Sequence, residues 1–251
     1  DFDKLTLESV IEFYKTFYHS GNCTIIASGK LSKDLIETLN RFFGKTTWGE
    51  VQAIPVPKME VQTTKQLKHF IEKPDAIQSA VRVGRLMFNK KNPDYFKFQV
   101  LNTILGGYFG SRLMTNIRED KGYTYGIGSG LASLVNGGFF YISTEVGTDV
   151  TNDTLKEIYK EIKLLREELV DADELETVRN YVLGQFLRSV DGPYSLADKF
   201  KAIWEFDLGY DYFEKYFEAV KTITPEEIKS LANMYLQEKD LIELVVGKKY
   251  N

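Results

Sequence analysis

The stretch ITPEEIKSLANMYLQEKDLIELVVGK, residues Ile223–Lys248, predicts a capped helix followed by a strand. Thr224 occupies the N-cap position, Pro225 follows at the first helical position, and Glu227 stands three residues after the cap. This order of residues is typical of a capping box at the start of a helix. An amphipathic helical pattern comes next, and the apolar run Leu241–Val246 then predicts a strand that ends in Gly-Lys.

The same unit occurs near the other end of the sequence. The stretch LTLESVIEFYKTFYHSGNCTIIASGK, residues Leu5–Lys30, aligns with Ile223–Lys248 without a gap at an offset of 218 residues. In this copy the strand is expected over Cys23–Ser28. The identical pairs are Thr6/Thr224, Glu8/Glu226, Gly29/Gly247 and Lys30/Lys248, and the apolar pairs include Leu5/Ile223, Val10/Ile228, Phe13/Leu231, Phe17/Tyr235 and Ile26/Leu244.

Many helix–strand pairs look alike, so the spacing carries more weight than the identities. An offset of 218 residues is a plausible domain length. We therefore expect residues 1–47 to be the helix–strand–helix end of a preceding domain whose body lies outside this sequence. Residues 48–66, which hold Gly49, Pro55 and Pro57, are expected to form a linker, and residues 67–251 a second domain.

Helices and strands alternate irregularly between the two copies. The patterns lack a regular β-α-β order and include a hairpin signal at Val135–Gly138, so they predict an α+β fold with an antiparallel sheet packed against helices. The predicted strands are Leu67–Ile71, Ile77–Phe88, Tyr123–Leu134 and Phe139–Val146, and the predicted helices are Lys33–Phe43, Pro93–Leu105, Ser111–Lys121, one through Leu155–Leu169, one begun by a capping box of Asp171 and Glu174, Ser195–Phe206 and Tyr210–Thr222.

Composition excludes several classes of function. The 251 residues are 43% hydrophobic and 27% charged with a formal charge of −4, values that are typical of a globular chain without the basic surface of a nucleic-acid or membrane binder. No apolar run approaches the length of a transmembrane helix.

Cys23 is the single cysteine, which excludes an internal disulfide and fits a reducing compartment such as the cytoplasm. His19, at a helix end, and His69 are far apart, so we expect no zinc site within this chain.

Glycine-rich segments raise the possibility of a nucleotide site. Gly106–Arg112 lacks the Lys-Ser/Thr of a phosphate-binding loop, and Gly126–Gly130 lacks the spacing of a dinucleotide fingerprint. On a strand, Gly126, Gly128 and Gly130 would share one face with Tyr125 on the other, which favours close packing of a helix or a peptide.

One polar pair could act on a substrate. In Arg118–Tyr125, REDKGYTY, an arginine near a helix end and a tyrosine on the expected strand are separated by a glycine turn. A guanidinium and a phenol aimed at one point would suit a carbonyl oxygen that becomes negative in a transition state. A solvated Arg118 and a packed Tyr125 are the alternative interpretation.

The chain resembles the second half of a pitrilysin/insulinase-type zinc metallopeptidase, the inverzincin family that includes mitochondrial processing peptidase. The resemblance covers essentially the whole sequence, and the pairing of G-G-x-x-x-S-R-L with R-x6-Y is its most specific part. The four stretches that carry it are Thr6–Lys30, Leu105–Leu113 (LGGYFGSRL), Arg118–Tyr125 and the closing ITPEEI unit.

The resemblance implies two related α+β domains that face each other across a closed chamber. The first domain of such enzymes carries the zinc motif H-x-x-E-H, which occurs nowhere in this sequence. The helix at the corresponding place, Pro93–Leu105, offers Phe96, Lys97, Val100 and Leu101 instead. The resemblance therefore implies that this chain holds no cofactor and cleaves nothing alone, and that zinc belongs to an N-terminal half or to a partner subunit in a homo- or hetero-dimer.

By the same resemblance, Arg118 and Tyr125 are substrate-binding residues for a peptide. They would contact the scissile carbonyl and stabilise the oxyanion. Two alternatives remain open at the level of sequence. The chain could belong to a non-catalytic structural or partner subunit of the same family, or it could be a small-molecule binding module that uses the glycine strip of residues 126–130.

Overall fold

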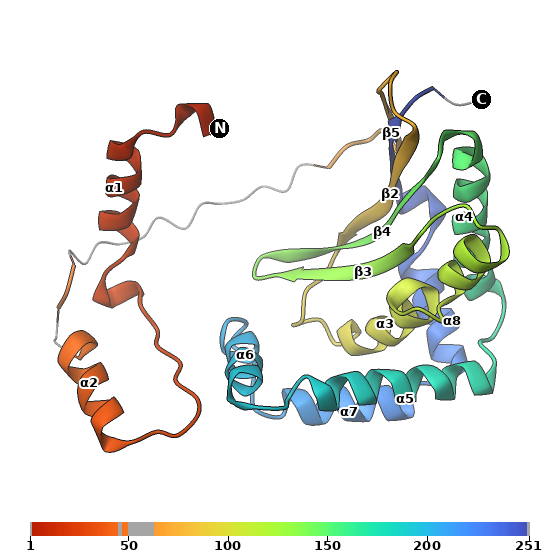
Figure 1. Ribbon diagram of the computed structural model, residues 1–251. Helices are drawn as coiled ribbons and strands as arrows, with labels where there is room; N and C mark the ends of the chain where they lie inside the picture. Colours follow the sequence, from red (N-terminus) through yellow and green to blue (C-terminus); the bar gives the residue numbers. More distant parts are fainter. Residues whose placement is uncertain (1, 45–46, 50–62, 250–251) are drawn as a thin grey trace. The chain divides into compact units, whose positions relative to one another are not determined.

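The computed structural model describes residues 2–44, 47–49 and 63–249, and it divides into two compact units (Figure 1). One unit comprises Asp1–Thr63 with Asp191–Lys201, and the other comprises Thr64–Val190 with Ala202–Asn251. The predicted linker, residues 48–66, lies mostly outside the described residues. None of the helices in the described part of the chain combines the length and the apolarity that a bilayer crossing requires.

The larger unit is built on a five-stranded mixed sheet with the order β1-β5-β2-β4-β3. All neighbours in the sheet are antiparallel except β1 and β5, which are parallel, so the predicted α+β class is correct and the predicted purely antiparallel sheet needs this one amendment. The strands are β1 (Lys68–Glu72), β2 (Gln78–Met87), β3 (Ile127–Leu134), β4 (Gly137–Gly147) and β5 (Ile242–Gly247).

Helices cover one face of this sheet (Figure 1). Val81 and Val83 of β2 and Ile142 of β4 point into the helical layer and are fully buried, whereas the alternate residues face away from it. The helices of the unit are α3 (Tyr95–Asn102), α4 (Thr151–Glu167), α5 (Ala172–Arg188), α7 (Tyr212–Thr222) and α8 (Pro225–Tyr235).

Capping residues in the sequence correctly predicted where α8 and α5 begin. Thr224 accepts a hydrogen bond from the backbone N–H of Glu227 and the Glu227 side chain accepts one from the Thr224 N–H, which confirms the predicted capping box of α8. At α5, Asp171 caps the helix as predicted, but the Glu174 carboxylate accepts two hydrogen bonds from Arg112 at 2.8 and 2.6 Å. The predicted capping role of Glu174 is therefore wrong, because its carboxylate forms a bidentate pair with Arg112 instead.

Two of the predicted helices contain π-helical turns, which are wider than those of an α-helix. The helix that begins at Tyr95 passes into a π-helical segment at Thr103–Gly107, and the helix near Arg118 is π-helical over Met114–Asp120. Gly106 lies where a Cβ atom would come within 2.7 Å of the Ser129 backbone nitrogen. The glycine thus allows the helix to approach β3, and its role is packing.

The smaller unit contains the first copy of the repeat, and two of its helices have no buried residue. These are α1 (Leu7–Phe17) and α2 (Lys33–Phe43), and α2 has the predicted bounds. The expected strand over Cys23–Ser28 is absent, because the described residues place no strand beside this segment. A further helix, α6 (Pro193–Trp204), begins in this unit.

The histidines have structural roles in the described chain. His19 lies beyond the end of α1, is 2% exposed, and accepts the Gly21 N–H on Nδ1 at 3.1 Å. His69, on β1, lies 2.9 Å from the Gln66 carbonyl oxygen through Nε2.

Candidate functional site

Arg118 lies in the π-helical segment Met114–Asp120 of the larger unit. Gly122 follows the end of this segment, and its φ of +66° suits glycine and turns the chain back toward the sheet. The Arg118 side chain is half-buried, and its guanidinium carbon lies 4.5 Å from the centre of the Phe109 ring. No carboxylate in the described residues forms an ion pair with Arg118, so its charge remains available to a ligand.

Tyr125 lies on a short segment that hydrogen bonds hold against the sheet. The Thr124 hydroxyl donates to the Glu145 carbonyl oxygen at 2.7 Å and accepts the Gly126 N–H at 3.1 Å. The Thr144 hydroxyl lies 3.0 Å from that of Thr124 and completes the attachment. The Tyr125 side chain itself is 96% exposed. The predicted strand over Tyr123–Leu134 is therefore too long, because these side-chain bonds hold residues 123–126 away from the ladder that begins at Ile127.

Arg118 and Tyr125 line the same open hollow of about 650 Å³. The hollow is shallow and polar, and its remaining lining residues are Gln78, Glu119, Gly122, Tyr123 and Thr124. The two side chains that the sequence singled out thus border one concave surface, with a guanidinium and a phenol as donors.

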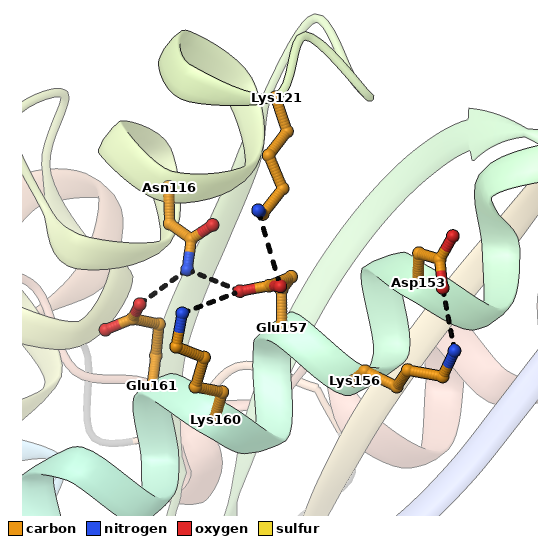
Figure 2. A network of polar contacts seen from close by, with 7 residues as sticks. All are labelled: Asn116, Lys121, Asp153, Lys156, Glu157, Lys160 and Glu161. Carbon is orange, nitrogen blue, oxygen red and sulfur yellow. Dashed lines mark hydrogen bonds and ion pairs between the residues drawn. The ribbon is translucent and has the colours of Figure 1, made fainter.

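A polar network fastens the segment that carries Arg118 to α4 (Figure 2). The Asn116 amide donates to Glu157 at 2.9 Å and to Glu161 at 2.6 Å, and the Lys121 ammonium lies 3.4 Å from Glu157. Burial raises the pKa of Glu157, but the hydrogen bonds from Asn116 and Lys121 outweigh it and leave the pKa below its ordinary value. Lys160 also reaches Glu157, at 3.5 Å, so the network supports an ionised carboxylate that holds Asn116, two residues before Arg118.

The residues that β2 contributes to this region were not among those predicted from the sequence. Gln78 lines the hollow with Arg118, and Arg82 lines an adjoining hollow of about 310 Å³ that also contains Gln78 and Tyr125. These residues lie about forty positions from Arg118 in the sequence, and only the sheet brings them together. One signal was present: Arg82 is a lone cation within the otherwise apolar run Ala80–Gly84.

The described residues do not fit a metal ion. They contain no group of three or more histidine, cysteine, aspartate or glutamate side chains that could hold one. On α3, Val100 and Leu101 are fully buried in the core and Lys97 pairs with Glu227. This helix therefore packs the domain.

Comparison with known proteins gives the same family as the sequence. A family model described as the peptidase M16 inactive domain matches residues 4–182. An uncharacterized zinc protease of Rickettsia bellii is 26% identical over 93% of this chain and 52% of its own length, and the uncharacterized zinc protease YmxG of Bacillus subtilis is 23% identical over 73% and 44%. A probable inactive metalloprotease of Bacillus subtilis, YmfF, is 20% identical over 79% of this chain and 46% of its own length.

Solved structures share the fold. A peptidase M16 inactive domain from Pseudomonas fluorescens superposes with a TM-score of 0.84 at 24% identity over 98% of this chain and 58% of that one. A chain of complex III2 from Candida albicans superposes with a TM-score of 0.75 at 12% identity, over 98% and 60%. The chain spans about half the length of the curated relatives that it matches. Because the family model covers well over half of the sequence, this chain belongs to the peptidase M16 inactive-domain family.

Proposed function

We propose that this chain is the substrate-binding half of a zinc metalloendopeptidase and that it acts on peptides. The observation that carries the proposal is the hollow that Arg118 and Tyr125 share, in which neither side chain has an ion-pairing partner among the described residues. Membership of the peptidase M16 inactive-domain family and the names of the zinc protease relatives support it.

The two donors act on the carbonyl group of the scissile peptide bond. The Arg118 guanidinium and the Tyr125 hydroxyl donate hydrogen bonds to its oxygen, and these bonds strengthen as negative charge develops on that oxygen. The Asn116 network and the pinned Thr124 reduce the motion of the two backbone segments, so the donors need little rearrangement when the peptide arrives.

The zinc ion belongs to another half in this proposal. Residues 1–47 are then the end of that zinc-bearing domain, residues 48–66 are the linker, and residues 67–251 are the second domain. The exposed apolar side chains of α1 support this division, since Val10 and Phe13 are more than half exposed where their counterparts Ile228 and Leu231 are buried. The matched relatives, which are about twice as long as this chain, have room for such a domain.

A structural or partner subunit is the second candidate. The relative named a probable inactive metalloprotease and the superposition on a chain of complex III2 favour it. A small-molecule module built on the glycine strip has less support, because the Tyr141 ring lies against Gly130 and the Gly106 carbonyl oxygen lies against Gly128.

Steady-state hydrolysis of a quenched fluorescent peptide by the full-length protein tests the proposal. Arg118→Ala is expected to lower kcat/KM by about 100-fold or more, which is the usual effect of removing one oxyanion donor, and Tyr125→Phe is expected to lower it by a smaller factor. Arg188→Ala, an exposed arginine on α5, is the matched control and should leave kcat/KM unchanged. Hydrolysis that survives Arg118→Ala at the wild-type rate would refute the role of Arg118.

A further inference from the structure

A second hollow adjoins the one that contains Arg118. Its volume is about 310 Å³, and it shares Gln78, Thr124 and Tyr125 with the first, so the two form one continuous concave surface with Tyr125 between them. Arg82 lines only the second hollow. A peptide bound at Arg118 and Tyr125 can therefore extend over Arg82 without leaving the surface of this domain.

Arg82 is held in place by groups that leave its charge intact. Its Nη1 donates to the Val81 carbonyl oxygen at 2.9 Å and to the Thr144 carbonyl oxygen at 3.2 Å. Both acceptors are neutral, and no described carboxylate lies within ion-pair distance of the Arg82 guanidinium. The result is a preorganised cation with donors to spare, which is the arrangement that binds carboxylates well.

The sheet leaves this cation accessible. Arg82 points to the face of the sheet that carries no helices, and its neighbours on that face of β2 are Ala80 and Gly84. Neither neighbour has a side chain long enough to cover the guanidinium. The residues paired with Arg82 across the sheet are Ser143 on β4 and Leu244 on β5, and neither bears a charge.

We infer that Arg82 binds a carboxylate of the peptide that Arg118 and Tyr125 hold. The carboxylate comes from an aspartate or glutamate side chain or from the C-terminus of the peptide. This inference rests on the proposed function, because it concerns the same peptide. Glu145 lines the same hollow, and its charge weakens the site, so Glu145→Gln is expected to tighten the binding of acidic peptides.

Binding of labelled peptides to the full-length protein, measured by fluorescence anisotropy in the presence of a metal chelator to prevent cleavage, tests the inference. The peptides share one sequence and differ in two features: an internal Asp or Asn, and a free or amidated C-terminus. We expect at least one acidic form to bind about tenfold more tightly than its neutral counterpart, the usual gain from a charge-assisted hydrogen bond. The feature that produces the gain identifies the source of the carboxylate.

Arg82→Gln keeps an N–H donor for the two carbonyl oxygens and removes the charge. In this variant the acidic and neutral peptides are expected to bind equally, whereas Arg188→Gln should preserve the difference. If wild-type protein binds all four peptides equally and Arg118→Ala weakens them all, the Arg82 inference is wrong and the proposed function stands. If no peptide binds, the proposed function fails and the inference fails with it.

Discussion

The two copies of the repeat have nearly the same local structure in very different surroundings. Thr6 caps α1 through a capping box with Ser9, and Thr224 caps α8 through a capping box with Glu227 at the corresponding position. Both helices run for eleven residues. Local sequence therefore specified the helix and its start in each copy, without regard to what lies around it.

Beyond the helix the copies differ. The strand of the second copy, β5, lies between β1 and β2, whereas the matching segment Cys23–Ser28 pairs with nothing in the described chain. Ile228 is fully buried, and its counterpart Val10 is 53% exposed. A strand and a buried helical face therefore form only where neighbouring elements pack against them. It also supports the proposal that the neighbours of the first copy belong to another domain.

The largest expected effect comes from truncating the matched apolar positions. Ile228→Ala should lower the free energy of unfolding by about 2–5 kcal/mol, because it leaves a cavity in the core. Val10→Ala should change it by less than about 0.5 kcal/mol in this 251-residue chain. Urea denaturation of both variants measures the difference, and equal losses would contradict the asymmetry between the copies.

Cys23 provides a chemical probe of the first copy. It aligns with Leu241, which is 1% exposed, yet its own thiol is exposed and free. A thiol reagent should label Cys23 in this chain about as fast as it labels a small thiol. In the full-length protein, where the preceding domain would cover Cys23, we expect the labelling rate to be about tenfold lower than in this chain. Equal labelling rates in the two samples would argue against that domain.

The capping threonines should differ by a smaller amount. Thr224→Ala removes the cap of a helix that is packed in the core, so we expect a loss of about 1 kcal/mol of unfolding free energy. Thr6→Ala removes an equivalent cap from a helix with no buried residues, and it should leave the main unfolding transition in place. Thermal unfolding followed by circular dichroism distinguishes the two outcomes.

The smallest expected effect is a pH dependence of the free energy of unfolding. We expect it from the second copy of the repeat and not from the first. The hydrogen bond from Lys97 lowers the pKa of Glu227 below its ordinary value of 4.5, so the ionised form stabilises the folded state. That stabilisation is present above about pH 4.5 and is lost as the pH falls through the lower folded pKa. It should amount to less than about 1 kcal/mol, because the side chain is 40% exposed.

Glu227→Gln should flatten the decline of stability in this acid range, as measured by urea denaturation at a series of pH values. Ser9→Ala, at the matched position of the first copy, removes no titratable group and is the control. A decline of the same steepness in Glu227→Gln and the wild type would show that Glu227 has no such role.

Much of the fold was predictable from the sequence because its signals are local. The helix Lys33–Phe43 was predicted with its observed bounds, and the hairpin between β3 and β4 turns at Val135 and Asn136, within the expected segment. The predictions failed where residues far apart in the sequence form hydrogen bonds with the backbone. Thr124 bonds to Glu145 and so delays the start of β3, and β1 pairs in parallel with a strand more than 170 residues away.

Only part of the lining of the candidate hollow was predictable from the sequence. Arg118 and Tyr125 are close in sequence, so one turn and one glycine sufficed to suggest that they act together. Arg82 and Gln78 reach the same surface only through the register between β2 and β4, which no local pattern specifies. The π-helical geometry around Arg118 was not predicted either, since the sequence pattern of residues 111–121 indicates only a helix.

We propose that this chain completes a zinc peptidase whose metal lies elsewhere, and the zinc content of the full-length protein is the measurement that can refute this proposal in one step. Elemental analysis and a peptide hydrolysis assay should be made on the same purified sample. We expect about one zinc ion per polypeptide, together with hydrolysis that a chelator abolishes. A full-length protein that contains no zinc and cleaves no peptide would contradict it and would favour the structural subunit.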